Sequence, residues 1–184
     1  MRAFALALLE VLEIAVVTIL AVVFIRYFLV QPFLVSGGSM DPTFHNGDYL
    51  LVDQLTYRFR APERGEVIVF KNADGTYFIK RIIGLPGDTV VVADGSVHIS
   101  DKAHPNGYVL GESYLPAKLP TSGNADVTLG DHQYFVMGDN RPYSYDSRSW
   151  GAVESKEIVG IVRLRLWPLS QAHAFFAPSY APAQ

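Results

Sequence analysis

The sequence predicts a mainly β protein, in which an N-terminal transmembrane helix precedes an antiparallel β-sheet or open-barrel domain with a small cap insertion. The first observation is a single long apolar stretch near the N-terminus, at residues 4–25. The second is a series of short runs rich in β-branched and aromatic residues, separated by Gly, Pro, Asn and Asp, which is typical of strands joined by tight turns. The third is that little of the remaining chain has the pattern of a helix, which favours an all-β domain.

Length and composition exclude several kinds of site. A chain of 184 residues is long enough for one domain and a small additional segment. The net charge of -3 comes without a basic block, which argues against a nucleic-acid partner. The absence of cysteine excludes disulfides, thiolate metal sites and a cysteine nucleophile. No two histidines have a helical ligand spacing, so we expect no metal and no cofactor.

The apolar stretch is predicted to anchor the chain in a membrane, with the anchor occupying residues 1–30. A helix needs about 20 apolar residues to cross a bilayer. Glu10 and Glu13 disfavour a span centred on them, so we prefer a span at 14–30, where only the long side chain of Arg26 must reach the interface. A cleaved signal peptide fits less well, because no Ala-x-Ala-like site follows, and a buried helix would need more partner helices. Sparse positive charge leaves the orientation open.

The β domain is predicted to span residues 31–169. Gln31-Pro32 ends the helix, and Asp94-Gly95 is a strong signal for a two-residue hairpin. Residues 102–131 are richer in Gly, Pro, Ser and Asn and are expected to leave the sheet as a small cap. The Ala/Pro-rich residues 170–184 are expected to form a flexible tail. Strands are expected at residues 49–52, 67–70, 77–83, 89–92, 96–99, 132–137 and 158–167.

A serine on a glycine-rich loop lies between the anchor and the first of these strands. Gly37 and Gly38 free the backbone before Ser39 from Cβ crowding, and Pro42 keeps the following residues extended or turn-like. Such a loop allows a substrate backbone to approach, and its N–H groups can point at a developing oxyanion. By itself this pattern more often marks a tight turn. A serine nucleophile also needs a base.

Lys80 is the candidate base, since it lies in the middle of a strand-like run. Strand alternation places it on one face with Phe78 and Ile82. Burial on an apolar face lowers the pKa of a lysine, and a neutral amine is a competent general base. The alternative is an edge-strand lysine that points to water. Because no histidine is well placed, a serine–lysine pair with Ser39 becomes the stronger interpretation.

A polar loop at residues 138–148 supplies possible supporting groups. Asp139 is predicted to pair with Arg81, and Asp146 with Arg148, which would fix the loop against the Lys80 strand. Ser144 is predicted to hydrogen-bond to the lysine amine and orient it. The alternative is a solvated loop whose surface ion pairs contribute little.

Four stretches of the chain together resemble the bacterial type I signal peptidases, peptidase family S26. They occur in the family's order after the expected anchor, and the resemblance extends to about residue 168. Four blocks at compatible spacing make the resemblance specific. The blocks are S-G-G-S-M-D-P-T-F at residues 36–44, R-G-E-V-I-V-F at 64–70, Y-F-I-K-R-I-I-G-L-P-G-D at 77–88 and G-D-N-R-P-Y-S-Y-D-S-R at 138–148.

The resemblance implies a membrane-anchored serine peptidase with Ser39 as nucleophile and Lys80 as general base. It implies that Ser144 helps to hold the lysine and that Asp146 and Arg148 shape the site. It also implies a largely antiparallel β domain on the membrane surface and substrates with small residues at the first and third positions before the cut, commonly Ala-x-Ala. Further supporting residues in the same blocks are Asp139, Arg81 and Met40.

One departure concerns the oxyanion hole. Some family members carry a serine two positions before the nucleophile, whereas this chain has Gly37 there, as in many Gram-positive-type members. The oxyanion would then depend mainly on backbone N–H groups of the loop formed by Gly37, Gly38 and Ser39. Ser36 is one residue too early for the same role. The short insertion and the lack of cysteine also resemble the Gram-positive-like short form.

The resemblance therefore implies a membrane-bound serine endopeptidase that removes signal peptides from exported preproteins through an acyl-enzyme. It implies a single-pass protein of the cytoplasmic membrane, with the catalytic domain on the extracytoplasmic face. Its partners would be signal peptides and the lipid bilayer, with the translocation machinery nearby. One alternative is a Ser-Lys peptidase dedicated to a single pilus, conjugation or surface substrate. Another is a non-catalytic membrane-tethered β module that binds exported chains. A self-cleaving Ser-Lys regulator would carry a DNA-binding module instead of a membrane helix.

Overall fold

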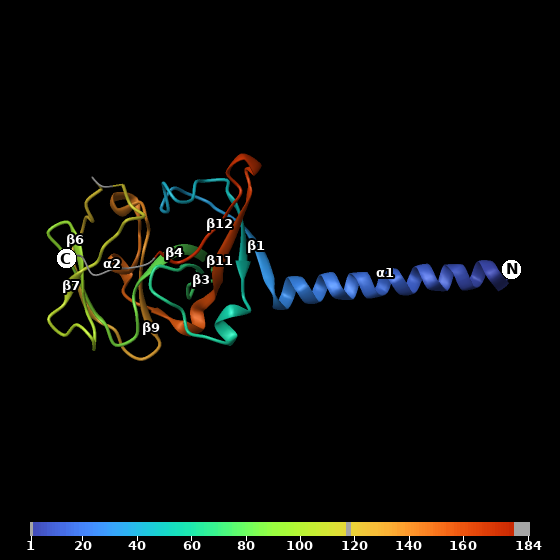
Figure 1. Cartoon of the computed structure of the whole chain (residues 1–184), viewed down its shortest axis with the longest axis horizontal. Helices are drawn as coiled ribbons and strands as arrows, with labels where there is room; N and C mark the ends of the chain where they lie inside the picture. The colour runs from blue at the N-terminus through green and yellow to red at the C-terminus, as the bar shows by residue number, and fades with distance from the viewer. Residues whose placement is uncertain (1, 117–118, 179–184) are drawn as a thin grey trace.

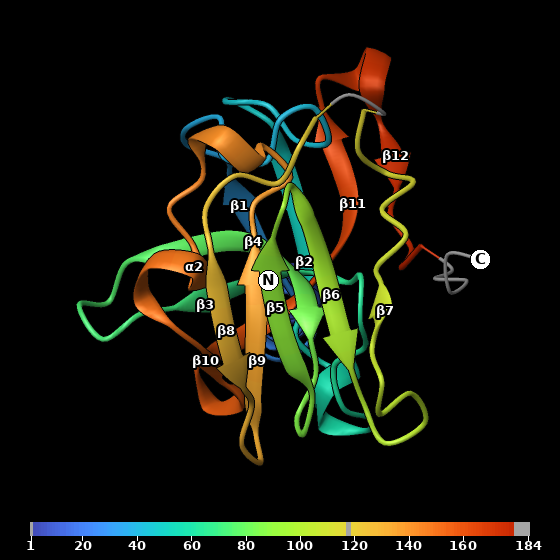
Figure 2. The same cartoon turned by 90° about the vertical axis from the view of Figure 1, so that its left-hand side faces the viewer.

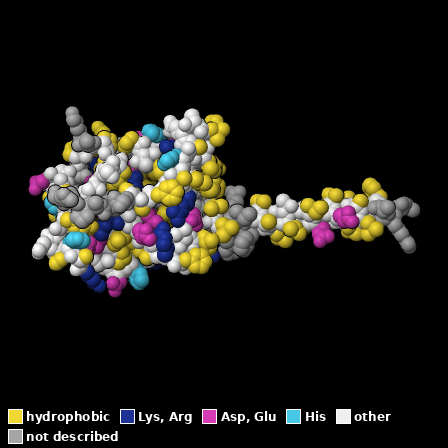
Figure 3. Space-filling view, in the orientation of Figure 1, with side chains coloured by type: hydrophobic (Ala, Val, Ile, Leu, Met, Phe, Trp, Pro, Cys, Tyr) yellow, Lys and Arg dark blue, Asp and Glu magenta, His cyan; other side chains and the backbone are white. Residues whose placement is uncertain are grey.

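The computed structural model describes residues 2–116 and 119–178, without the side chains of residues 2, 3, 5 and 24–28. A single long helix, α1 (Arg2–Phe28), projects from a β-rich domain (Figure 1). Its segment Leu6–Val23 is long and apolar enough to cross a membrane, and none of this segment is buried against the domain. Figure 3 shows the helix surface as mainly hydrophobic, with two acidic side chains near its N-terminal half. These belong to Glu10 and Glu13.

The helix ends two residues earlier than the expected bound at residue 30. Leu29 already accepts a hydrogen bond from the N–H of Gln54 at 3.0 Å, and Val30 begins a strand that pairs with Asp53. This strand, β1 (Val30–Leu34), is not among the predicted elements. It tolerates Pro32 because it lies at the edge of its sheet. The preferred span at 14–30 includes side chains outside the described part, so its register stays a prediction.

The larger sheet has eight strands, and every pairing in it is antiparallel. The order is β1-β2-β11-β3-β4-β9-β10, and β12 pairs with β11. Strand β11 therefore joins the half that holds β1 and β2 to the half that holds β3, β4 and β9. The strands beyond β1 are β2 (Tyr49–Asp53), β3 (Val67–Lys71), β4 (Tyr77–Gly84), β9 (Gln133–Met137), β10 (Val153–Glu154), β11 (Ile158–Trp167) and β12 (His173–Ala174).

The smaller sheet has four strands in the order β7-β6-β5-β8 (Figure 2). Asp94 and Gly95 link β5 to β6 with φ of 53° and 79°, as a two-residue turn of this kind requires. The segment at residues 102–131, expected to form a small cap, contributes two strands to this sheet, since β7 pairs with β6 and β8 pairs with β5. The strands are β5 (Thr89–Ala93), β6 (Ser96–Ser100), β7 (Tyr108–Val109) and β8 (Ala125–Thr128).

Short helical turns connect several strands. The only one with α-helical geometry after α1 among the described residues is α2 (Ser147–Trp150). The 310 turns are η1 (Thr56–Arg58), η2 (Arg141–Tyr143), η3 (Ser155–Glu157) and η4 (Leu169–Gln171). The mainly β prediction is confirmed, and each expected strand is present to within one residue at either end.

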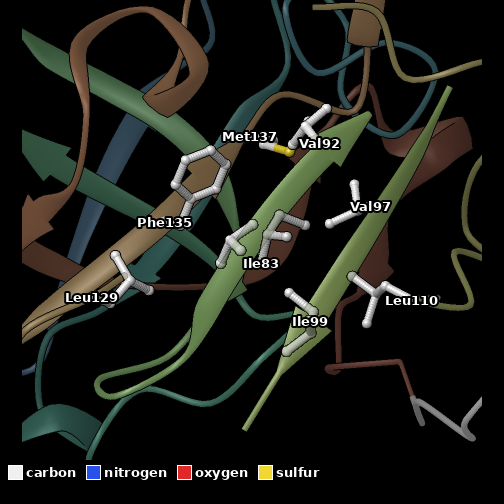
Figure 4. Close-up of a cluster of buried hydrophobic side chains, with 9 residues drawn as sticks. Ile83, Val92, Val97, Ile99, Leu110, Leu129, Phe135 and Met137 are labelled. Atoms are coloured by element: carbon white, nitrogen blue, oxygen red, sulfur yellow. The ribbon is translucent and has the colours of Figure 1, made fainter. Parts of the chain in front are cut away.

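Two buried clusters hold the site in place. The first joins the two sheets, since Ile83 and Phe135 of the large sheet pack with Val92 and Ile99 of the small one (Figure 4). The second lies under the loop that follows β1, where Met40 and Phe44 are fully buried against side chains of β2, β3 and β11. Burial of this kind contributes about 1.5–3 kcal/mol for each large apolar side chain.

The C-terminal segment differs from the expected flexible tail as far as residue 178. Strand β12 pairs with β11, and the N–H of Phe175 donates to the carbonyl of Arg163 at 2.8 Å. The ring of Phe175 packs on Phe44, with centroids 4.4 Å apart. The segment therefore covers the second cluster because its aromatic side chain packs there. Residues 179–184 lie outside the described part of the chain.

Candidate active site

Ser39 lies on the irregular loop between β1 and β2. The loop needs glycine at two positions for two different reasons. Gly37 has φ of 92°, and its N–H donates to Asn46 Oδ1 at 2.9 Å. A Cβ on Gly38 would lie 2.5 Å from a carboxylate oxygen of Asp41. The first glycine is required by its backbone conformation and the second by close packing.

Met40, directly after the serine, anchors this loop from below. Its side chain is buried in the cluster under the loop, and its carbonyl accepts the N–H of Phe44 at 2.9 Å. Two successive residues therefore have opposite environments: Ser39 faces the surface cleft and Met40 faces the core. This arrangement restricts where the serine hydroxyl can point.

Lys80 lies on β4, and its ammonium donates to Ser39 Oγ at 2.7 Å. The lysine is 2% exposed. Burial lowers the pKa of Lys80 to about 8, although the charges of Asp146 and Asp139 raise it, and the nearby Arg148 guanidinium lowers it again. The pKa of the Lys80 amine is thus shifted toward the physiological range mainly because water is excluded from it.

Asp139 connects three separate segments around the pair. Its two oxygens accept from Arg81 Nε at 2.8 Å and from Arg81 Nη2 at 2.6 Å. The hydroxyl of Thr43, on the serine loop, donates to the same carboxylate at 2.5 Å. Because Arg81 directly follows Lys80, this carboxylate fixes the lysine strand, the serine loop and the loop at 138–148 relative to one another.

Asp146 and Arg148 form a second buried ion pair on the same loop. Arg148 donates from Nε at 2.8 Å and from Nη2 at 2.7 Å, and the N–H of Gly138 donates to the same carboxylate at 3.0 Å. Burial opposes ionisation of Asp146, but Arg148 and the Gly138 N–H hold its pKa below the usual value. Asp146 therefore remains a negative charge close to Lys80. Both ion pairs predicted from the sequence are present.

Ser144 does not make the contact predicted for it. Its buried hydroxyl has no hydrogen-bond partner of good geometry among the described residues, and Lys80 donates to Ser39 instead. A Cβ on Gly138 would lie 2.2 Å from Ser144 Oγ and 2.3 Å from the carbonyl oxygen of Ser39. The hydroxyl is thus packed beside Gly138, where only glycine allows the two loops to approach so closely.

Asn140 belongs to the site although the sequence did not single it out. Its N–H donates to the carbonyl of Ser39 at 3.0 Å, and its side-chain Nδ2 donates to the carbonyl of Gly38 at 2.8 Å. Both carbonyls are therefore turned toward the loop at 138–148. Within residues 2–116 and 119–178, no acceptor pairs with the N–H groups of Gly38 or Ser39. The only signal in the sequence is the position of Asn140 next to Asp139.

A cavity of about 280 Å3 lies beside the serine–lysine pair. One wall is the end of β1 with the start of the serine loop, and the other is the first half of β4. Phe33 and Tyr77, one from each wall, contact each other with ring centroids 5.2 Å apart. Among the described residues, β1 pairs with β2 alone and β9 pairs with β4 from Arg81 onward, so each wall presents an open strand edge. The lining is mainly apolar: Phe33, Leu34, Val35, Leu50, Val69, Phe78 and Ile79, with Ser36, Thr76 and Tyr77.

The described residues contain no group of three His, Asp or Glu side chains that could hold a metal ion. The polar groups gathered at the cleft are the Ser39 hydroxyl, the Lys80 amine and backbone N–H groups of the serine loop. This donor set is that of acyl transfer by a serine nucleophile.

Comparison with known proteins gives one consistent family. The family model described as signal peptidase, peptidase S26, matches residues 8–167. The probable signal peptidase I-2 of Synechocystis is 39% identical over 168 residues, covering 88% of this chain and 74% of that protein. Signal peptidase IB of Staphylococcus aureus is 32% identical over 162 residues, covering 82% and 85%. The crystal structure of a signal peptidase I from Enterococcus faecalis is 31% identical and covers 55% of this chain and 97% of that one, with a TM-score of 0.46.

Proposed function

Because this chain belongs to the signal peptidase family, peptidase S26, and is thus a serine endopeptidase that removes signal peptides, we propose that it cleaves with a Ser39–Lys80 dyad. The observation that carries the proposal is the 2.7 Å contact between Lys80 Nζ and Ser39 Oγ in a water-excluded position. A hydroxyl within hydrogen-bond reach of an amine of lowered pKa is an activated nucleophile.

In the acylation step, neutral Lys80 takes the proton of Ser39 Oγ as this oxygen attacks the scissile carbonyl carbon. The resulting oxyanion is close to the N–H of Ser39, which is not engaged by an acceptor among the described residues. The Lys80 ammonium then protonates the leaving nitrogen as the C–N bond breaks. This leaves an ester on Ser39 and a new amino terminus on the mature protein.

In the deacylation step, Lys80 takes a proton from water as the water oxygen attacks the ester carbonyl. The ammonium returns that proton to Ser39 Oγ when the ester bond breaks, which releases the signal peptide as a carboxylic acid that loses its remaining proton to solvent water. The amine must be neutral at the start of both steps. At pH 7, one unit below the pKa of about 8, about a tenth of the lysine is neutral.

The cleft between β1 and β4 supports an extended substrate. Both walls present open strand edges, so a signal peptide can add a strand between them, with main-chain hydrogen bonds giving affinity. The apolar lining and the limited volume of about 280 Å3 favour small side chains close to the cut. Ala-x-Ala before the scissile bond satisfies both conditions.

The proposal places α1 across the cytoplasmic membrane and the β domain on its extracytoplasmic side, near the site where preproteins emerge. The apolar surface of α1 supports a membrane span. Large apolar side chains exposed on the β domain support its resting on the bilayer surface. They include Phe59, Trp167, Leu169 and Phe176.

The test uses the full chain, purified in detergent, and a preprotein with an Ala-x-Ala site. Mass spectrometry of the products is expected to show cleavage after the last alanine by the parent and none by Ser39→Ala. Ser149→Ala and Lys102→Ala are the matched controls and keep the parent rate, because both positions are exposed and neither side chain lines the catalytic cleft. Cleavage by Ser39→Ala at the parent rate, or none by a folded parent, contradicts the proposal.

A further inference from the structure

Asn140 has no part in the proton transfers described above, although it makes two hydrogen bonds to the serine loop. Its backbone N–H donates to the carbonyl of Ser39 at 3.0 Å, and its side-chain Nδ2 donates to the carbonyl of Gly38 at 2.8 Å. Ser39 lines the catalytic cleft and Asn140 does not. Asn140 therefore acts on the nucleophile only through the backbone of the loop.

The side-chain bond fixes the direction of a backbone donor. The carbonyl of Gly38 and the N–H of Ser39 belong to the same peptide group, which is trans. In a trans peptide group the C=O and N–H bonds point in opposite directions. Because the carbonyl points toward Asn140, the N–H of Ser39 points away from Asn140 and from the loop at 138–148.

The serine loop does not fix this direction by itself. Gly37 and Gly38 lack a Cβ, so rotation about their backbone bonds is less restricted than in other residues. The carbonyl of Gly38 also accepts the N–H of Asp41 at 3.2 Å, but this bond lies within the loop and moves with it. The bond from Asn140 is shorter and comes from a distant part of the chain, so it holds the Gly38–Ser39 peptide group relative to the rest of the domain.

Asn140 is a firm support because its own neighbours are fixed. Its carbonyl accepts the N–H of Tyr143 at 3.0 Å in the η2 turn. Asp139, directly before it, is completely buried and accepts hydrogen bonds from Arg81 and from the hydroxyl of Thr43. The amide of Asn140 therefore projects from a backbone that is held on both sides.

The direction of the Ser39 N–H is important in this chain because residue 37 is glycine. Gly37 has no hydroxyl to offer to an oxyanion, so the donors are backbone N–H groups. Donors stabilise an oxyanion best when they already point to the place where its charge develops. A peptide group that is free to rotate would have to be ordered again in each attack, and this would reduce the stabilisation.

We propose that Asn140 is a positioning residue for the oxyanion: its side-chain amide holds the Gly38–Ser39 peptide group so that the Ser39 N–H faces the scissile carbonyl oxygen. The proposal rests on the Ser39–Lys80 function above and adds a residue that touches neither the substrate nor the base. Loss of an oxyanion donor lowers kcat by about 100–1000-fold. Loss of its support leaves the donor in place for part of the time, so we expect a decrease of about 10–100-fold.

The experiment compares the full-length parent, Asn140→Ala and the control Asn106→Ala in detergent, with kcat and KM measured on an Ala-x-Ala preprotein. Asn106 is exposed and does not line the catalytic cleft, so its variant keeps both parent values. Asn140→Ala is expected to lose kcat and to keep the parent KM. The rising limb of its pH profile stays in place, because a methyl group replaces an uncharged amide and the charges of Asp146, Asp139 and Arg148 are unchanged.

A matched pair of inhibitors reports on the oxyanion position directly. A peptide aldehyde ending in Ala-x-Ala forms a hemiacetal with Ser39 Oγ, and its former carbonyl oxygen then lies where the oxyanion develops. The corresponding peptide alcohol fills the same cleft but forms no such adduct. Asn140→Ala is expected to bind the aldehyde about tenfold or more weakly than the parent does, and to bind the alcohol equally well.

A parental kcat in folded Asn140→Ala overturns the proposal. Equal weakening of aldehyde and alcohol, a raised KM at parental kcat, or a displaced pH limb also overturns it, because each indicates a general loosening of the site. If Asn140→Ala is unfolded by thermal denaturation, Asn140→Asp replaces it. This variant keeps the shape and turns the donor into an acceptor, and its kcat is compared on the plateau above the pH limb, where its added charge has no effect on the ionisation of the base.

Cleavage by the parent and by Ser39→Ala, measured in the same detergent, reports on the proposed function separately. A folded parent that does not cleave contradicts the dyad itself. Equal cleavage by the parent and Asn140→Ala, with none by Ser39→Ala, contradicts only the role of Asn140.

Discussion

Each face of strand β4 buries one basic side chain, but the two side chains have different partners. Lys80 and Arg81 are neighbours, and both are almost completely buried. Arg81 meets the two oxygens of Asp139 and keeps its charge, whereas the nearest partner of Lys80 is the hydroxyl of Ser39. Burial lowers the pKa of Lys80 to about 8, and the neutral hydroxyl beside it does not offset this shift as a paired carboxylate would. Arg81 fixes the site, and the neighbouring Lys80 can take up and release a proton.

We expect the largest effect from a substitution that gives both positions on β4 the same kind of cation. Lys80→Arg keeps a positive charge near Ser39 but replaces the base with a group that does not lose its proton in proteins. We expect preprotein cleavage to fall by about 10⁴-fold, the upper range for a general base. The measurement is kcat/KM on an Ala-x-Ala preprotein. Lys102→Arg is the matched control, and retained activity in Lys80→Arg would show that another group is the base.

The next largest effect is expected from removing the Asp139 carboxylate, which pairs with Arg81 on the other face of β4. Asp139→Asn leaves the charge of Arg81 buried without its counter-charge, which costs about 3–5 kcal/mol in the free energy of unfolding. Denaturant unfolding of the full chain in detergent measures this cost. Glu63→Gln, which removes the exposed partner of Arg60, is the control and changes stability by about 0.5 kcal/mol or less. Equal losses in the two variants would mean that the Asp139 pair is not a structural support.

The smallest expected effect is a shift in the pH dependence of cleavage, which reports the pKa of Lys80. A base must be neutral, so kcat/KM is expected to fall about tenfold per pH unit below the pKa of about 8. Asp146 raises the pKa of Lys80, so Asp146→Asn lowers it and moves the rising limb of the pH profile to lower pH. Since Arg148 then also loses its partner, its charge acts in the same direction. A limb that moves to higher pH, or a profile that is flat in acid, contradicts this role of Lys80.

The β domain is more predictable from the sequence than its contacts. Strands such as 77–83 are predictable because alternating or β-branched runs between Gly and Pro signals depend on local physics. β1 is not predicted from the sequence, because it contains Pro32 and directly follows an apolar helix, so its residues resemble the end of that helix. β8 escapes it because its polar sequence, Ala-Asp-Val-Thr, becomes a strand only beside β5.

The site shows the same limit at the level of side chains. Complementary charge is enough to predict the pairs of Arg81 with Asp139 and of Arg148 with Asp146. The contacts of Asn140 are not predictable, because its partners are backbone carbonyls about a hundred residues away. The hydrogen bond expected from Ser144 to Lys80 is absent, since that hydroxyl is packed beside Gly138 and Lys80 donates to Ser39. Residue types are enough to predict which charged groups can pair, but the hydrogen bonds of a given side chain depend on the tertiary structure.

The central position of β11 in the large sheet has a consequence for how the protein is made. The serine loop follows β1 and the lysine lies on β4, and in the described sheet these two halves are hydrogen-bonded to each other through β11, which begins at residue 158. A nascent chain that has exposed both side chains but not β11 lacks the strand that hydrogen-bonds to both halves of the sheet. The large sheet that carries Ser39 and Lys80 is therefore completed only after β11 has been synthesised, well after both of these residues.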